Sequence, residues 1–276
     1  MTSAGLQGAS RESLKSARET LGALIRSGDT DLPAVSDDLF SLTALLDREL
    51  PLRRALTDPS RDGDARVGLA RAVLGEHVGG ATADLLAWVV RARWSAPREL
   101  ATALELLAVE AQVAAAEKAG RLDAVEDELF RIARSVAGAP ELRSALSDTA
   151  APVANRASLI EGLLEGRTSE ETRRLVRQAV VAPRGRTFDR TVELYGQVAA
   201  DRRSRLVATV TASAPLTEEQ RSRLGAVLRR IYGHEVHLNV QLDEDIVGGI
   251  RVEIGDEVID GSVLSRLDEA RRRLVG

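Results

Sequence analysis

Cysteine is absent from the 276 residues of this chain, and aromatic residues make up only 3% of it. Without cysteine the chain has no disulfide bond, no thiolate nucleophile and no cysteine-ligated zinc. The shortage of aromatic residues argues against a base-stacking surface and against an aromatic-lined cofactor site. Only two lysines occur, Lys15 and Lys118, and neither follows a glycine-rich loop, which excludes a P-loop.

Long apolar runs are also missing. The longest uncharged apolar run, Leu85 to Val90, is far shorter than the ~20 residues of a membrane-spanning helix. Residues 1–10 lack a basic stretch followed by an apolar one, so we expect no secretory signal. The formal net charge of −4 provides no overall positive field for nucleic acid or anionic lipid. The balance of 44% hydrophobic and 29% charged residues is typical of a globular protein.

An internal repeat is the most informative feature of the chain. Residues 34–40 (AVSDDLF) return 90 positions later as residues 124–130 (AVEDELF). At the same offset, residues 52–58 (LRRALTD) return as residues 142–148 (LRSALSD). Two matches in one register indicate a duplication, and a period near 90 is too long for a single solenoid unit. Each copy is therefore predicted to be a module of several helices.

The spacing of apolar residues and prolines predicts where these modules lie. Leucines recur at helical spacing in both copies, and prolines fall between the apolar stretches. We expect an N-terminal helix over residues 10–25 and a first module that completes residues 1–119. The second module is expected over residues 120–202. Because residues 98–136 hold no proline and one glycine, a single long helix is expected to join the two modules.

The pattern changes after Arg205 to that of a small α/β domain over residues 203–276. Residues 206–211, 236–241 and 250–254 read as strands, and residues 258–259 can extend the pairing. Residues 217–220 (TEEQ) form a capping box ahead of an amphipathic helix. A final helix is expected over residues 262–274. The predicted fold class is mainly α, with two homologous helical modules followed by a β-α-β-β-α domain.

No constellation of residues indicates catalysis or metal binding. His234 and His237 are three apart on a predicted strand end, which is not the spacing of a helical zinc motif. Ser262 reads as a helix-start residue and not as a nucleophile. Arginines follow an apolar helix end in both copies, at 91 and 93 and at 184 and 186. Arg184 and Arg186 could bind an anion, but we expect the arginines to form salt bridges that lock adjacent helices.

The C-terminal residues resemble a known family. The motifs at residues 213–220 (SAPLTEEQ), 247–252 (VGGIRV) and 258–263 (VIDGSV) resemble the delta subunit of the F-type ATP synthase, the family of the mitochondrial oligomycin-sensitivity-conferring protein. The second helical copy is similar to the family's N-terminal bundle, including Arg186 before the last helix. The first copy departs from typical members and resembles the long actinobacterial form.

The resemblance implies a non-catalytic subunit of the peripheral stalk, without cofactor or metal. The helical part is expected to bind N-terminal segments of the alpha subunits, and the C-terminal domain to bind the b subunit. Membrane association is then indirect, at the cytoplasmic face of the bacterial cell membrane. The candidate partner-binding residues are Leu224, Leu228, Ile231, Gly248, Gly249, Ile250 and Arg186.

Two other readings stay open from the sequence. One is that most of these apolar candidates are simply core residues of the terminal domain. The other concerns function, because a helical adaptor or scaffold for another amphipathic helix would have the same general pattern. An RNA-binding role is disfavoured, since residues 203–276 hold 11 arginines, no lysine and 12 acidic residues, a net charge of −1.

Overall fold

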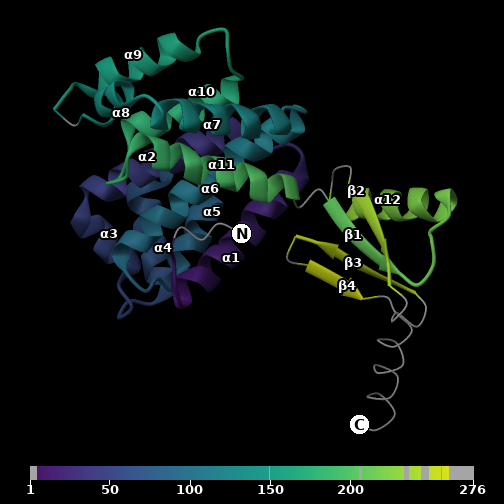
Figure 1. Cartoon of the computed structure of the whole chain (residues 1–276). Coiled ribbons are helices and arrows are strands. Elements are labelled where there is room, and N and C mark those ends of the chain that lie inside the picture. The colour runs from purple at the N-terminus through teal and green to yellow at the C-terminus, as the bar shows by residue number, and fades with distance from the viewer. Residues whose placement is uncertain are drawn as a thin grey trace. The chain divides into compact units, whose positions relative to one another are not determined.

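The computed structural model describes residues 5–148, 150–204, 207–232, 236–243, 249–255 and 257–260. The chain divides into two compact units, a helical unit over residues 2–200 and a terminal α/β unit from residue 201 onward (Figure 1). The helical unit contains both copies of the repeat. The three-part division predicted from the sequence therefore stays a prediction.

The helices follow the 90-residue period closely. The first copy contributes α2 (Leu32–Arg48), α3 (Leu50–Thr57), α4 (Gly63–Leu74) and α5 (Gly80–Arg91), with a short 3-10 turn over Gly75–His77. The second copy contributes α7 (Leu122–Ala137), α8 (Pro140–Ser147), α9 (Val153–Leu164) and α10 (Glu170–Val181). The remaining helices of the unit are α1 (Ala9–Ser27), α6 (Pro97–Lys118) and α11 (Phe188–Ser204). The predicted duplication is confirmed as a repeat of helices.

The period also reveals that α6 has two structural roles. Shifting α1 by 90 residues places it on residues 99–117, within α6, and shifting α6 places it on α11. Helix α6 is therefore the last helix of the first bundle and the first helix of the second. Both of its faces are buried, as expected for a helix that is covered all round, and Figure 1 shows it in the middle of the helical unit.

The expected continuous helix between the modules is wrong. Helix α6 ends at Lys118, and α7 begins at Leu122. Gly120 lies between them with φ +69°, a left-handed conformation that glycine adopts without the steric cost of a Cβ atom. One glycine in a strongly helical stretch thus lets the chain turn from one helix to the next.

A buried arginine recurs in each copy and ties the ends of its helices together. In the first copy Arg66 of α4 donates to the carbonyl oxygens of Arg91 and Ala92, each at 3.0 Å. In the second copy Arg156 of α9 donates to the carbonyl oxygens of Leu146 at 3.3 Å and Val180 at 3.4 Å. Carbonyls at the end of a helix lack intrahelical partners, so these guanidinium groups satisfy helix-end carbonyls in each bundle.

The terminal unit is a four-stranded sheet with one described helix. Its elements are β1 (Val207–Ala212), α12 (Glu218–Tyr232), β2 (His237–Leu242), β3 (Ile250–Ile254) and β4 (Glu257–Asp260). The strand order is β2-β1-β3-β4, with β1 and β2 parallel and the other two pairs antiparallel. The parallel pair is joined through α12, as parallel strands require a crossover. The predicted strands and their helix are confirmed, and the final helix expected over residues 262–274 lies outside the described residues.

The start of α12 has the predicted capping box. The Thr217 amide donates to the Gln220 side chain at 2.9 Å, and the Gln220 amide donates to the Thr217 hydroxyl at 3.2 Å. These two bonds satisfy amide groups that have no partner within the helix. Across the described residues, none of the helices combines the length and apolar character needed to cross a membrane.

Candidate functional site

The terminal domain uses several of the predicted partner-binding residues in its own core. Leu228 is 2% exposed and packs with buried residues of β1 and β3, while Leu224 and Ile250 pack against this core and are partly buried. Ile231 is on the same helix but is 49% exposed. The side chain of Ile231 therefore remains available for a partner, whereas Leu228 cannot make a direct contact without disrupting the core.

The structure describes one of the two glycines that precede β3. Gly248 lies outside the described residues. Gly249 is exposed and adopts φ +85°, a region that L-residues with a Cβ atom rarely occupy. The backbone can enter β3 in this way because position 249 is a glycine.

Replacing Gly249 by valine is expected to destabilise the terminal domain. A β-branched residue at this positive φ costs about 1–3 kcal/mol of backbone strain. The loss of stability is measured by thermal unfolding of the full chain, monitored through a signal that reports on the terminal domain. Gly225→Ala is the matched control. Gly225 lies inside α12 with open space at its Cβ position, so alanine fits there and has the higher helix propensity. Unchanged melting of Gly249→Val would show that the strain argument is wrong.

Arg186 lies in the helical unit, inside a buried network of charges centred on Glu105 of α6. Glu105 is 1% exposed and accepts hydrogen bonds from Arg184 at 2.6 Å, from Tyr195 at 3.1 Å and from Arg186. Arg184 also binds Asp47 of α2 at 2.6 Å. The network thus joins α2, α6, α11 and the loop before α11. The salt-bridge interpretation of the repeated arginines is confirmed for Arg184 and Arg186.

Burial makes this network sensitive to the loss of any member. The carboxylates of Glu105 and Asp47 are paired with the guanidinium groups of Arg184, Arg186 and Arg53, and Glu105 and Arg184 are largely shielded from water. Burial alone would lower the pKa of Arg184, but the negative charges of Glu105 and Asp47 outweigh that effect and raise it. Arg184 therefore stays charged, and its role in the isolated chain is to hold the two copies together.

Tyr195 gives the network a dependence on alkaline pH. Burial, and after it the negative charge of Glu105, raises the pKa of Tyr195 well above its ordinary value of 10.0. Since the folded pKa lies above the unfolded one, the contribution to stability is complete below the unfolded pKa and is lost as pH rises from about 10 upward. We expect the melting temperature of the helical unit to fall in this range.

The Tyr195→Phe variant should be less stable at neutral pH but should lose this part of the alkaline dependence. Melting curves of both proteins between about pH 8 and pH 11 test the point. Tyr232→Phe is the control, because Tyr232 belongs to the terminal domain and not to the helical unit. Burial and its bond to Glu257 raise the pKa of Tyr232 to about 12. Its replacement should leave the alkaline slope of the helical unit unchanged. Equal alkaline slopes for wild type and Tyr195→Phe would contradict the assignment.

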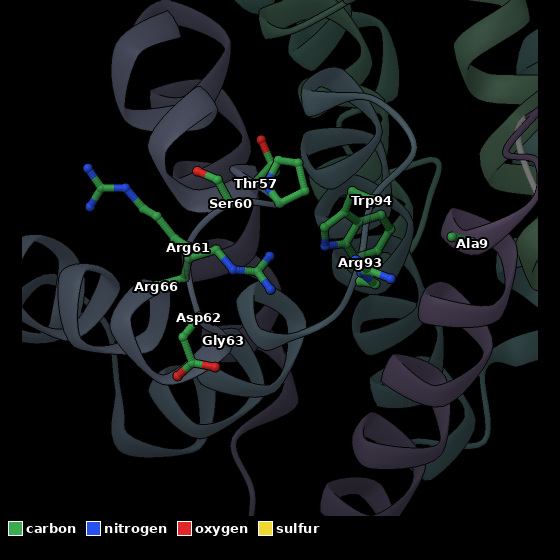
Figure 2. Close-up of a pocket in the computed structure, with 10 residues that line it drawn as sticks. Ala9, Thr57, Ser60, Arg61, Asp62, Gly63, Arg66, Arg93 and Trp94 are labelled. Atoms are coloured by element: carbon green, nitrogen blue, oxygen red, sulfur yellow. The ribbon is translucent and has the colours of Figure 1, made fainter.

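The pocket drawn in Figure 2 lies in the first copy and has a volume of about 620 Å³. Several of its polar groups are used by the fold. Arg66 binds the carbonyls described above, Trp94 donates to the Val89 carbonyl at 2.9 Å, and Asp62 caps α4 by accepting from the Asp64 amide. Within the described part of the chain, no group of three or more histidine, cysteine or acidic residues has a geometry suited to a metal ion.

The polar residues of α6 were not identified in the sequence as site residues. Glu105, Glu110 and Gln112 stand in a helix otherwise rich in alanine, leucine and valine, and all three are buried. An acid in such a stretch requires a buried partner, which is a signal that the sequence does contain. Asp47, the second acid of the network, gives no comparable signal because it lies at the end of an amphipathic helix.

Among the described residues, the buried carboxylates of Glu105, Glu110 and Glu171 are each paired with arginines. Charge used in this way stabilises the fold, which is typical of a structural protein. Residues 108–274 match the family model described as ATP synthase delta (OSCP) subunit. The chain belongs to this family, whose members are non-catalytic structural subunits of the ATP synthase.

The relatives cover nearly the whole chain. Proteins named ATP synthase subunit delta are 50% identical in Streptomyces coelicolor over 270 residues, covering 98% of each chain, and 48% identical in Kineococcus radiotolerans over 269 residues, also covering 98% of each. Another with that name in Acidothermus cellulolyticus is 48% identical over 272 residues, 98% of this chain and 99% of the relative. The long actinobacterial form is thus confirmed. The family model itself begins within α6, so the first copy precedes the matched range.

Proposed function

We propose that this chain is the peripheral-stalk subunit that links the catalytic head of an F-type proton-translocating ATP synthase to its b subunit. The observation that carries the proposal is its similarity, over nearly its full length, to relatives named ATP synthase subunit delta. In this role the helical unit binds N-terminal segments of the alpha subunits. The terminal domain binds the b subunit, and the chain resists the torque of the rotor during ATP synthesis.

The internal construction of the helical unit supports a load-bearing role. Helix α6 belongs to both bundles, so the two copies are joined through a shared helix and not only through a linker. Within the Glu105 network, Arg184 pairs with Asp47 of the first copy and with Glu105 of the shared helix, so these ion pairs tie the two copies together. Attachment through two separate units raises the effective affinity for one complex without requiring that either contact be tight.

The terminal domain offers an apolar contact surface for the stalk. On α12, Val227 and Ile231 are 37% and 49% exposed and are four residues apart, so they share one side of the helix. An amphipathic helix of the b subunit is a suitable partner for such a pair. The proposed location is the cytoplasmic face of the bacterial cell membrane, where the chain is held peripherally by the complex. A nucleic-acid partner is not proposed, because the domain carries no net positive charge.

Titration of the purified full-length chain into a catalytic head that lacks this subunit tests the proposal directly. We expect tight one-to-one binding by calorimetry, and we expect it to be lost when the alpha N-terminal segments are trimmed. Ile231→Asp should weaken binding to the b subunit while leaving binding to the head intact. No binding to a competent head would overturn the proposal and would leave a helical adaptor with another partner.

A further inference from the structure

Two adjoining hollows in the first copy are lined by more arginines than acids. The larger is the pocket of about 620 Å³ drawn in Figure 2, and the smaller, of about 470 Å³, shares Arg61 and Trp94 with it. The charged residues that line the two hollows are Arg54, Arg61, Arg66, Arg93, Asp58 and Asp62. The lining is therefore locally positive, although the chain as a whole has a formal net charge of −4.

Both aspartates of the lining are used by the loop between α3 and α4. Asp58 accepts hydrogen bonds from the Ser60 amide at 2.9 Å and from the Ser60 hydroxyl at 2.7 Å. Its distance to the guanidinium group of Arg61 is longer, 3.6 Å. Asp62 accepts from the Asp64 amide at 3.1 Å, at the start of α4. The two carboxylates thus shape the loop, and within the described chain neither is hydrogen-bonded to an arginine of the hollows.

The four arginines differ in how the fold uses them. Arg66 is 5% exposed, and its terminal nitrogens donate to the carbonyls at the end of α5. Arg54 and Arg93 are exposed, and their side chains have no hydrogen-bond or ion-pair partner among the described residues. Arg61 is also exposed and has the long contact with Asp58. Arg54, Arg61 and Arg93, which we call the rim arginines, are therefore available to an anion.

The second copy shows which of these arginines the fold of the repeat requires. Its helices follow those of the first copy at an offset of 90 residues, and the buried arginine recurs as Arg156. The rim arginines do not recur, because the corresponding residues are Ser144, Ala151 and Pro183. The same set of helices thus forms without them. Folding accounts for the buried arginine but not for the gathering of three further arginines at one place in the first copy.

We propose that the two hollows bind a small anion that carries two or more phosphate groups. Guanidinium groups donate paired N–H groups to phosphate oxygens, and a volume of about 620 Å³ is within the range of small-molecule sites. The rim arginines lie on three separate segments, α3, the loop after α3 and the loop after α5. Because one anion has to meet all three, several charged groups suit the site better than one. The inference concerns the chain alone and does not depend on the proposed function.

The wall beside Arg93 is held in place by the rest of the fold. The side chain of Trp94 is 9% exposed, and its Nε1 donates to the Val89 carbonyl at 2.9 Å. The backbone carbonyl of Arg93 accepts from the Ser13 hydroxyl of α1 at 2.6 Å. A guanidinium group on a fixed backbone loses less conformational freedom on binding than one on a mobile loop.

Calorimetric titration of the full-length chain with inorganic diphosphate and with ADP tests the inference, in a buffer of low ionic strength. We expect one-to-one binding that weakens as salt is added, because charged groups supply the contacts. Inorganic phosphate and AMP should bind about tenfold more weakly, since each has one phosphate group fewer to offer. Tighter binding of ADP than of diphosphate would identify a nucleotide as the ligand, and the reverse order would identify the inorganic anion.

Substitution of the rim arginines locates the site. Arg54→Ala and Arg93→Ala are each expected to weaken binding about tenfold, the effect of losing a hydrogen bond to a charged group. Their melting temperatures without ligand should equal that of the wild type, because both side chains are exposed and unpaired among the described residues. Arg190→Ala is the matched control, an exposed arginine of α11 outside the hollows, and should bind within about twofold of the wild type.

The tryptophans give a second measurement. Trp88→Phe leaves Trp94 as the only tryptophan of the chain, so that its fluorescence reports on the wall of the hollows. We expect its emission to change with the same midpoint as the calorimetric titration. No binding of diphosphate or ADP up to about 10 mM would overturn the inference. Binding that both Arg54→Ala and Arg93→Ala leave unchanged would place the anion elsewhere and would overturn it as well. Neither result affects the proposed function, which is tested by binding to the catalytic head.

Discussion

Replacing Glu105 by alanine is expected to destabilise the helical unit by about 3–5 kcal/mol, the cost of breaking a buried ion pair by removing one partner. The substitution leaves the guanidinium groups of Arg184 and Arg186 without their shared carboxylate, in a site where water replaces it poorly. The Tyr195 hydroxyl loses its acceptor at the same time. Because all three side chains donate to the same carboxylate, one substitution removes all of these hydrogen bonds.

Thermal and urea unfolding of the full chain measure this effect. For a unit of this size the expected loss corresponds to a fall in melting temperature of roughly 6–20 °C. Glu105→Gln, which keeps an acceptor oxygen but no charge, should fall between the wild type and the alanine variant. The control is Arg174→Ala, which breaks exposed pairs with Asp37 and Glu170 and should cost about 0.5 kcal/mol or less. Equal stability of Glu105→Ala and Arg174→Ala would refute the central role of Glu105.

Phe40→Ala is expected to cost about 3–5 kcal/mol, whereas Phe130→Ala is expected to cost no more than about 0.5 kcal/mol. The two residues share their type, their helix and their position in the repeat. Only their surroundings differ, because Phe40 packs against Tyr195 and Phe130 is 59% exposed. Truncation of Phe40 leaves a cavity between the two copies, and truncation of Phe130 removes a side chain from solvent.

Urea unfolding of both variants under the same conditions gives their free energies of unfolding. An unchanged slope m, the dependence of that free energy on urea concentration, shows that the same cooperative transition is compared. A large loss of stability in Phe130→Ala would mean that its ring is covered within the isolated chain.

The sequence alone determined most of the local structure and the presence of the repeat. Two heptads in one register predicted the duplication, because residues with the same neighbours fold into the same helices. Period-two alternation and the capping box predicted β2, β3 and the start of α12, since these patterns act within a few residues. The family was also recognisable from the terminal motifs, which are short and contiguous.

Tertiary structure alone decided how these elements share their surfaces. Leu228 and Ile231 belong to one apolar stripe, but only packing against the sheet buries the first and leaves the second exposed. Periodicity gives the direction of a side chain on its own helix and contains no information about which distant helix meets it. The join between the modules was wrong for a related reason, because summed helix propensity could not show that Gly120 would take a left-handed conformation.

The two copies of the repeat also differ in what the sequence and what the fold determine. The sequence made Phe40 and Phe130 equivalent and placed acidic residues in α6. Only the fold made α6 a member of both bundles, gathered Arg184, Arg186 and Tyr195 around Glu105, and covered one phenylalanine while leaving the other open. A duplicated sequence repeats its local instructions, but a stack of two copies has one inner face and one outer face, and burial depends on which of these a residue occupies.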